Sequence, residues 1–342
     1  MTGTAKRLNK GPGAKSGAIT NQHWTGENTM TTAFVFPGQG SQEVGMGQDL
    51  AAAYPVARQV FEEVDEALGQ KLSAIMANGP EEDLRLTENA QPALMAVSVA
   101  VALVIQAESG KTLAELASHV AGHSLGEYSA LTAAGSLDLA DCARLLKQRG
   151  QAMQQAVPVG LGAMAALLGL SLEDAVAAAG EAAEGQICSA ANDNAVGQVV
   201  VSGDAQAVER AIEIAKEKGA RRAMMLPVSA PFHCALMQPA AEVMAAALAS
   251  IEINTPAVPL VANVTAAAET DTDRIRGLLV DQVTSMVRWR ESVLFLKTQG
   301  VDHLTEIGAG KVLSTMTRRI DREISASAIG TPADIDAFLQ IV

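Results

Sequence analysis

Residues 122–126 read GHSLG, which has the residue types and spacing of a nucleophile elbow, G-x-S-x-G. An apolar stretch precedes this segment, and a helical pattern follows it from residue 127 to 134. A turn this tight between a strand and a helix strains the serine backbone and makes its hydroxyl project from the end of the sheet. The N–H of Leu125 then lies at the helix N-terminus, where an oxyanion binds. The pattern predicts Ser124 as a nucleophile, against the alternative of a chance Gly/Ser turn.

A serine nucleophile needs a base, and the sequence contains five histidines: His23, His119, His123, His233 and His303. His233 follows an expected strand and precedes an expected helix, and α/β sheets form their sites in loops at strand ends. The others lie in the N-terminal extension, in the elbow pointing away from Ser124, or at strand starts. Elimination therefore favours His233, against a loop histidine packed on Phe232. As the group that orients the base, Asp281 and a backbone carbonyl both stay open.

An arginine lies on the apolar side of the helix expected over residues 138–155. Arg149 is four residues after Leu145 and four before Met153, so it shares their face. A buried arginine needs an anionic partner. The position predicts a bidentate clamp for a substrate carboxylate, with an internal salt bridge or a snorkelling side chain as the alternatives.

Two glycine-rich loops fail the patterns of nucleotide-binding loops. Residues 36–42 read FPGQGSQ, and Glu43 stands where G-x-G-x-x-G needs its third glycine. Residues 308–311 read GAGK, but Val312 replaces the serine or threonine of a P-loop and the earlier glycine is missing. Neither loop supports nucleotide chemistry.

The composition excludes several classes of protein. The chain has 342 residues with 49% hydrophobic and 18% charged residues, which is enough for a large core, and its net charge of −13 disfavours nucleic acid as a partner. Its three cysteines include no CxxC pair, so we expect no disulfide framework, no metal site and a cytoplasmic location. The longest apolar run, residues 93–105, is too short to span a membrane, which needs about 20 residues.

The order of elements predicts an α/β protein. Residues 1–30 lack periodicity and are expected to be a disordered extension. Alternating strands and helices over 31–157 and 229–342 predict a main domain with a mostly parallel sheet. Residues 158–228 follow the order βαββαβ, with a turn at 192–194, and predict an inserted ferredoxin-like subdomain.

As a set, seven segments of the chain resemble the malonyl-CoA:acyl carrier protein transacylases, the acyltransferases of fatty acid synthesis. The resemblance covers about residues 31–342, and its segments are 36–42, 122–130, 149–150, 197–200, 231–237, 263–265 and 308–313. It implies an α/β-hydrolase-like main domain with a ferredoxin-like insert, in agreement with the order of elements.

The resemblance also implies a role for each matching residue. Ser124 is acylated and His233 is its general base. Arg149 pairs with the free carboxylate of the malonyl group, and the backbone N–H groups of Gln39 and Leu125 form the oxyanion hole. The main-chain carbonyl of Gln282 orients the histidine in place of an aspartate. Phe232 crowds an α-methyl branch and so favours malonyl.

The implied reaction is a ping-pong transfer of malonyl from malonyl-CoA to the phosphopantetheine thiol of acyl carrier protein through malonyl-Ser124. The resemblance implies no cofactor, and we expect a monomer with no membrane or nucleic-acid partner. Because such carrier proteins are acidic, a basic run that includes Arg221 and Arg222 is a candidate docking surface; ordinary solvated charges are the alternative. A thioesterase-like hydrolase and an inactive scaffold that only binds carrier protein remain rival functions.

Overall fold

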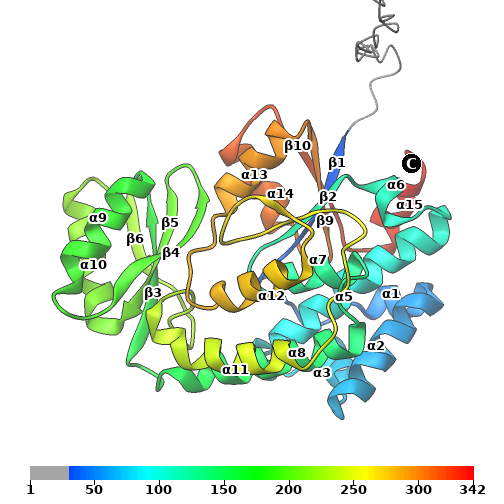
Figure 1. Ribbon diagram of the computed structural model, residues 1–342, viewed down its shortest axis with the longest axis horizontal. Helices are drawn as coiled ribbons and strands as arrows, with labels where there is room; N and C mark the ends of the chain where they lie inside the picture. The colour runs from blue at the N-terminus through cyan, green and yellow to red at the C-terminus, as the bar shows by residue number, and fades with distance from the viewer. Residues whose placement is uncertain (1–30) are drawn as a thin grey trace, which may run out of the picture.

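The computed structural model describes residues 31–342, so the disordered extension expected at 1–30, and His23 with it, lies outside the described residues. The chain forms a large α/β part and a smaller part built on a second sheet, which lie side by side (Figure 1). The predicted fold class is confirmed.

The larger part is organised around a six-stranded sheet in the order β10-β9-β1-β2-β7-β8. Its neighbouring strands are parallel except for β8, which runs antiparallel to β7. The strands are β1 (Thr32–Phe36), β2 (His119–Gly122), β7 (Leu260–Val261), β8 (Ala268–Glu269), β9 (His303–Ile307) and β10 (Ser325–Ile329). β1 and β2 lie at the centre, so the loops that follow them meet at one edge of the sheet.

Helices cover both faces of this sheet (Figure 1). Before the small sheet the chain forms α1 (Gln48–Ala53), α2 (Pro55–Leu68), α3 (Leu72–Asn78), α4 (Glu81–Arg85), α5 (Thr87–Ser109), α6 (Leu113–Leu116), α7 (Gly126–Ala133) and α8 (Leu139–Ala156). After it come η1 (Ala235–Met237), α11 (Gln238–Ala249), α12 (Thr272–Asp281), α13 (Trp289–Thr298), α14 (Val312–Ile320) and α15 (Pro332–Leu339).

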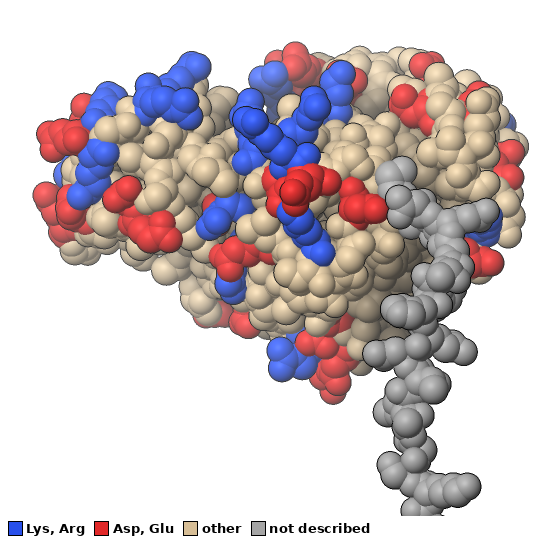
Figure 2. All heavy atoms as spheres, turned by 90° about the horizontal axis from the view of Figure 1, so that it is seen from above, with Lys and Arg blue, Asp and Glu red and all other residues tan. Residues whose placement is uncertain are grey.

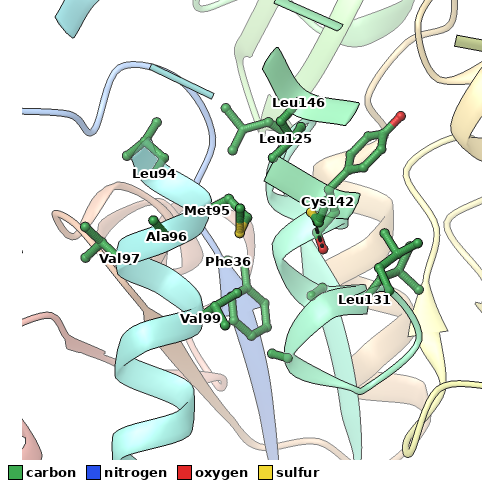
Figure 3. Close-up of a cluster of buried hydrophobic side chains, with 14 of the residues drawn as sticks. Phe36, Leu94, Met95, Ala96, Val97, Val99, Leu125, Leu131, Cys142 and Leu146 are labelled. Atoms are coloured by element: carbon green, nitrogen blue, oxygen red, sulfur yellow. Dashed lines mark hydrogen bonds between the residues drawn. The ribbon is translucent and has the colours of Figure 1, made fainter. Parts of the chain in front are cut away.

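Helix α5 forms the centre of the main core. It is the one described helix long and apolar enough to cross a membrane, yet 83% of its apolar window is buried inside the protein. Met95 and Val99 of α5 lie beside Phe36 at the end of β1, with α7 and α8 opposite (Figure 3). The expectation of a buried helix here is confirmed, and this packing fixes the end of β1 from which the first site loop departs.

The smaller part is an antiparallel sheet in the order β4-β5-β3-β6 with α9 (Leu172–Ala183) and α10 (Ala205–Glu217) packed against it. Its strands are β3 (Gly162–Leu168), β4 (Cys188–Ala195), β5 (Gln198–Asp204) and β6 (Arg222–Met225). The order of elements is the βαββαβ order expected from the sequence. The division of the chain at 157/158 and 228/229 stays a prediction.

The turn expected at residues 192–194 is wrong, because these residues belong to β4. The turn falls at residues 196–197, where Gly197 adopts a φ of 69°. β4 is prolonged by the main domain: the N–H of Asp193 donates to the carbonyl of Val287 at 2.9 Å, and the Asp193 carboxylate pairs with Arg290 at 2.9 Å. These contacts join one edge of the small sheet to the main domain.

Candidate active site

The elbow at the end of β2 contains two glycines at positions where the packing leaves no room for a Cβ atom. A Cβ on Gly122 would lie 1.9 Å from the carbonyl carbon of Gly126, and a Cβ on Gly126 would lie 2.2 Å from the carbonyl oxygen of Phe36. This close approach lets the chain reverse directly into α7, and Ser124 at the tip adopts a φ of 53°. The predicted strand–turn–helix setting of Ser124 is confirmed.

Ser124 and His233 form a hydrogen-bonded pair. Nε2 of His233 lies 2.8 Å from Oγ of Ser124, and Nδ1 lies 2.9 Å from the main-chain carbonyl of Gln282. Because that carbonyl can only accept, Nδ1 carries the proton and Nε2 is free to accept the serine proton. Of the two groups left open for orienting the base, the structure has the backbone carbonyl, while the Asp281 side chain is exposed.

The imidazole of His233 is kept neutral by its surroundings. Burial and the nearby charge of Arg149 lower the pKa of His233 to about 3, outweighing the hydrogen bond to Gln282. A neutral imidazole facing a serine hydroxyl is the arrangement that general-base catalysis needs.

Arg149 is 1% exposed and lies directly beside the serine. Its Nη1 donates to Oε1 of Gln91 at 2.8 Å, and its Nη2 donates to Oε1 of Gln282 at 2.8 Å and to Oγ of Ser124 at 3.2 Å. Across residues 31–342 it forms no ion pair, and its Nε has no hydrogen-bond partner. A buried cation held only by neutral acceptors is well placed to receive a carboxylate from outside the protein.

Three polar residues, Asn263, Gln282 and Glu127, form hydrogen bonds with the elbow or with one another. Asn263 accepts the N–H of Ser124 through Oδ1 at 2.8 Å and donates through Nδ2 to the carbonyl of Gly122 at 2.6 Å. Nε2 of Gln282 donates to the carbonyl of Ser124 at 3.0 Å and to the carboxylate of Glu127. Burial raises the pKa of Glu127 to about 7, although hydrogen bonds from Gln282 and Asn263 oppose the shift.

The serine opens into a cavity of about 460 Å³ between the two parts of the molecule. Gln39, from the loop after β1, lines it together with Leu125. Within the described residues, the backbone N–H groups of Gln39 and Leu125 donate to no protein acceptor, as an oxyanion hole requires. Phe232 lines the cavity beside His233 and is itself buried.

We expected His123 to point away from Ser124, and this expectation is wrong, because His123 lines the same cavity as Ser124. Its Nε2 lies 2.9 Å from Oδ1 of Asn194 in β4, and its ring lies 5.8 Å from that of Trp289. His119 and His303 begin β2 and β9, as expected for histidines outside the site.

Comparison with known proteins shows the family to which the chain belongs. The family model of the acyl transferase domain matches residues 33–327. The chain belongs to the acyl transferase family. The acyl transferase is 50% identical over 309 residues to the malonyl CoA-acyl carrier protein transacylase of Escherichia coli K12, covering 90% of this chain and 99% of that relative.

Two solved structures share the fold of the acyl transferase. An acyl-carrier-protein S-malonyltransferase from Bartonella henselae superposes with a TM-score of 0.89 at 54% identity, covering 91% of this chain and 99% of that one. A malonyl-transacylase in complex with a type II polyketide synthase acyl-carrier protein superposes with a TM-score of 0.88 at 47% identity, covering 91% of this chain and 100% of that one.

Arg221 and Arg222 of the acyl transferase are exposed at the start of β6. Arg221 packs on Gly169, which lies against Gly197 at the turn before β5, and the next residue, Gln198, accepts from Arg319 at 3.2 Å. These contacts link the basic run of Arg221 and Arg222 to a second basic run further along the chain, which consists of Arg318, Arg319 and Arg322. Figure 2 shows a face on which several Lys and Arg side chains lie, with Asp and Glu side chains among them.

Sequence reasoning assigned no role to four residues of this site, namely Gln91, Glu127, Asn194 and Asn263. Asn263 falls in one of the segments that carried the family resemblance, and Glu127 directly follows the elbow, so position alone marked two of them. Nothing in the local pattern marks Gln91 or Asn194 as a site residue, because Gln91 lies within the long helix α5 and Asn194 lies within the polar run that ends β4.

Proposed function

We propose that this acyl transferase is an acyl-carrier-protein S-malonyltransferase of fatty acid synthesis, which moves malonyl from coenzyme A to the phosphopantetheine thiol of acyl carrier protein. The observation that carries this proposal is the buried, unpaired Arg149 next to the Ser124–His233 pair. A simple serine hydrolase has no need for a buried cation 3.2 Å from its nucleophile. The malonyl transacylases among the relatives are consistent with it.

The first half of the proposed reaction forms malonyl-Ser124. Nε2 of His233 takes the hydroxyl proton while Oγ of Ser124 attacks the thioester carbonyl. The oxyanion that develops accepts hydrogen bonds from the N–H groups of Gln39 and Leu125, each worth about 3 kcal/mol. Collapse breaks the carbon–sulfur bond, and the coenzyme A thiolate leaves with the proton from His233.

The second half runs the same steps with the carrier protein. The phosphopantetheine thiol gives its proton to His233 and attacks the ester carbonyl of malonyl-Ser124. The second oxyanion collapses, the new thioester forms, and the Ser124 oxygen regains the proton from His233. We propose this ping-pong scheme for the enzyme, and the scheme needs no cofactor.

Selection of malonyl falls in this proposal to Arg149 and Phe232. The guanidinium binds the free carboxylate through two parallel hydrogen bonds, which an acetyl group cannot offer. The ring of Phe232, packed beside His233 on the cavity wall, leaves little room for a branch at the α-carbon.

The basic surface that includes Arg221 and Arg222 is the proposed docking site for the acidic carrier protein. The second solved structure named above pairs a related enzyme with its carrier protein. We further propose a monomeric cytoplasmic enzyme, in keeping with three free cysteines.

Intact-protein mass spectrometry tests the proposal. The protein is mixed with malonyl-CoA without carrier protein, and we expect a stable gain of one malonyl group that Ser124→Ala lacks. Release of free malonate without an adduct would instead identify a thioesterase-like hydrolase. No adduct and no turnover would favour a scaffold that only binds carrier protein.

A further inference from the structure

Glu127 is a buried carboxylate to which the proposed reaction gives no task. It lies in the first turn of α7, three residues after the nucleophile, and is 1% exposed. Burying an ionisable group is costly unless its contacts compensate for lost hydration. Its contacts therefore indicate what it does for the site.

The carboxylate of Glu127 receives two hydrogen bonds from residues distant in sequence. Oε2 accepts from the side-chain amide of Gln282, and Oε1 accepts from the backbone N–H of Asn263 at 3.3 Å. Both residues also contact Ser124: Nε2 of Gln282 donates to its carbonyl, and Oδ1 of Asn263 accepts from its N–H. Glu127 thus joins the two groups that hold the elbow in place.

Two acceptors set which way the side-chain amide of Gln282 faces, namely the carboxylate of Glu127 and the carbonyl of Ser124. The ionised carboxylate and the carbonyl only accept, so they draw the NH₂ end of the amide toward themselves. The carbonyl end then points the opposite way, where Oε1 of Gln282 accepts from Nη2 of Arg149 at 2.8 Å. With the amide reversed, its NH₂ would face the guanidinium, and two donors would repel each other.

We propose that Glu127 is a positioning residue for Arg149, acting by fixing the orientation of the Gln282 amide so that the guanidinium is held beside Ser124 for the carboxylate of the acyl group. This inference rests on the proposed role of Arg149 in malonyl transfer. It assigns Glu127 to substrate selection through the side chain of Gln282, while the main-chain carbonyl of Gln282 separately orients His233.

The test compares Glu127→Gln with wild type in two single-turnover acylations of Ser124, one with malonyl-CoA and one with acetyl-CoA. A glutamine keeps the volume but can offer an NH₂ to Gln282, so it withdraws one of the two acceptors that fix the amide and leaves the Ser124 carbonyl as the other. Labelling with a fluorophosphonate, which needs Ser124 and His233 but has no carboxylate, counts the folded sites in each preparation. We expect the malonyl-to-acetyl rate ratio to fall about tenfold to a hundredfold per labelled site.

Glu306→Gln is the matched control. Glu306 is also a fully buried glutamate, but it accepts from the backbone N–H groups of Leu313 and Ser314 at the start of α14. We expect it to leave the malonyl-to-acetyl ratio unchanged. Equal losses of both rates in Glu127→Gln, with the ratio preserved, would mean that Glu127 is only structural and would overturn the proposal.

A double-mutant cycle with Gln282→Met tests the path of the effect. If Glu127 acts through Gln282, the double variant has the same ratio as Gln282→Met alone, whereas losses that multiply would refute that path. Should Glu127→Gln give no labelled sites, Gln282→Met decides, because an unchanged ratio there also overturns the proposal. A wild type that never forms malonyl-Ser124 would instead refute the proposed function.

Discussion

Replacing Arg149 with alanine separates binding of the acyl carboxylate from the chemistry at Ser124. In the free protein, both Nη atoms of the guanidinium donate hydrogen bonds only to neutral acceptors. Charge-assisted hydrogen bonds contribute about 1.5–3 kcal/mol each, so a bidentate pair contributes about 3–6 kcal/mol. At about 1.4 kcal/mol per factor of ten, Arg149→Ala should lower kcat/KM for malonyl-CoA about 10²- to 10⁴-fold.

Acetyl transfer should respond in the opposite sense. The acetyl group has no carboxylate, and in the wild type its methyl group lies against a buried charge. Removing that charge should leave acetyl transfer unchanged or raise it. The hydroxyl of Ser124 keeps its partner His233 in the variant, so the chemical step itself survives.

The assay is rapid quench followed by intact-mass detection of acyl-Ser124, with each acyl-CoA in turn. Arg144→Ala is the matched control, because Arg144 lies on the same helix but is exposed and pairs with Asp141 at 2.6 Å. Arg149→Lys should fall between, since an ammonium keeps the charge but loses the fork. Equal losses for malonyl and acetyl would refute the clamp.

Three further predictions concern the glycine of the elbow, the titration of Glu127 and the docking surface. Gly126→Ala should lower the free energy of unfolding in urea by about 3 kcal/mol, because its Cβ would lie 2.2 Å from a backbone carbonyl oxygen. Gly180→Ala is the control, because Gly180 lies on α9 with open space around it. This control should leave the free energy of unfolding unchanged or raise it by about 0.5–1 kcal/mol. Because burial raises the pKa of Glu127 from 4.5 to about 7, the folded state holds the extra proton; its contribution to stability is present below pH 4.5 and lost as pH rises to about 7. The unfolding free energy of wild type relative to Glu127→Gln should therefore fall by about 3 kcal/mol across that range, and a flat difference would refute the shift. Arg221→Glu with Arg222→Glu should raise the KM for carrier protein and weaken its dependence on salt; an unchanged KM would move the docking surface elsewhere.

Local patterns predicted the elements that carry the candidate catalytic residues. The two glycines around Ser124 and the apolar spacing around Arg149 are properties of short segments, so they could be recognised without the fold. His233 required elimination among five candidates, because its loop has no periodicity.

Long-range contacts could not be predicted in the same way. Glu127 meets Asn263 across 136 residues and Gln282 across 155, and no pattern within either segment encodes that meeting. Residues 192–194 were mistaken for a turn because asparagine and aspartate favour turns. In the structure, the main domain supplies the partners for Asp193 that make a strand the better solution.

The alternation of strands and helices read from the sequence does not specify β10 or α15 individually. β10 reads SASAI, a short and weakly apolar run whose burial depends on pairing with β9. α15 has only eight residues, and its sequence marks were a proline at its start and the capping box of Thr331 and Asp334. Both elements lie beyond the last segment that the family resemblance used.

The attachment of β4 to the main domain makes the two walls of the cavity unequal targets for redesign. On the β4 side, the cavity is lined by Asn192 and Asn194, which flank Asp193, so a change that shifts this strand also affects the Asp193–Arg290 pair and the pairing of Asn192 with Val287. On the opposite side, Leu226, Pro227 and Val228 follow β6, the outer strand of the small sheet, and line the same cavity. An enzyme engineered for longer acyl chains should gain its space from residues 226–228, where Leu226 and Val228 contact the main core by apolar packing and no ion pair has to be broken.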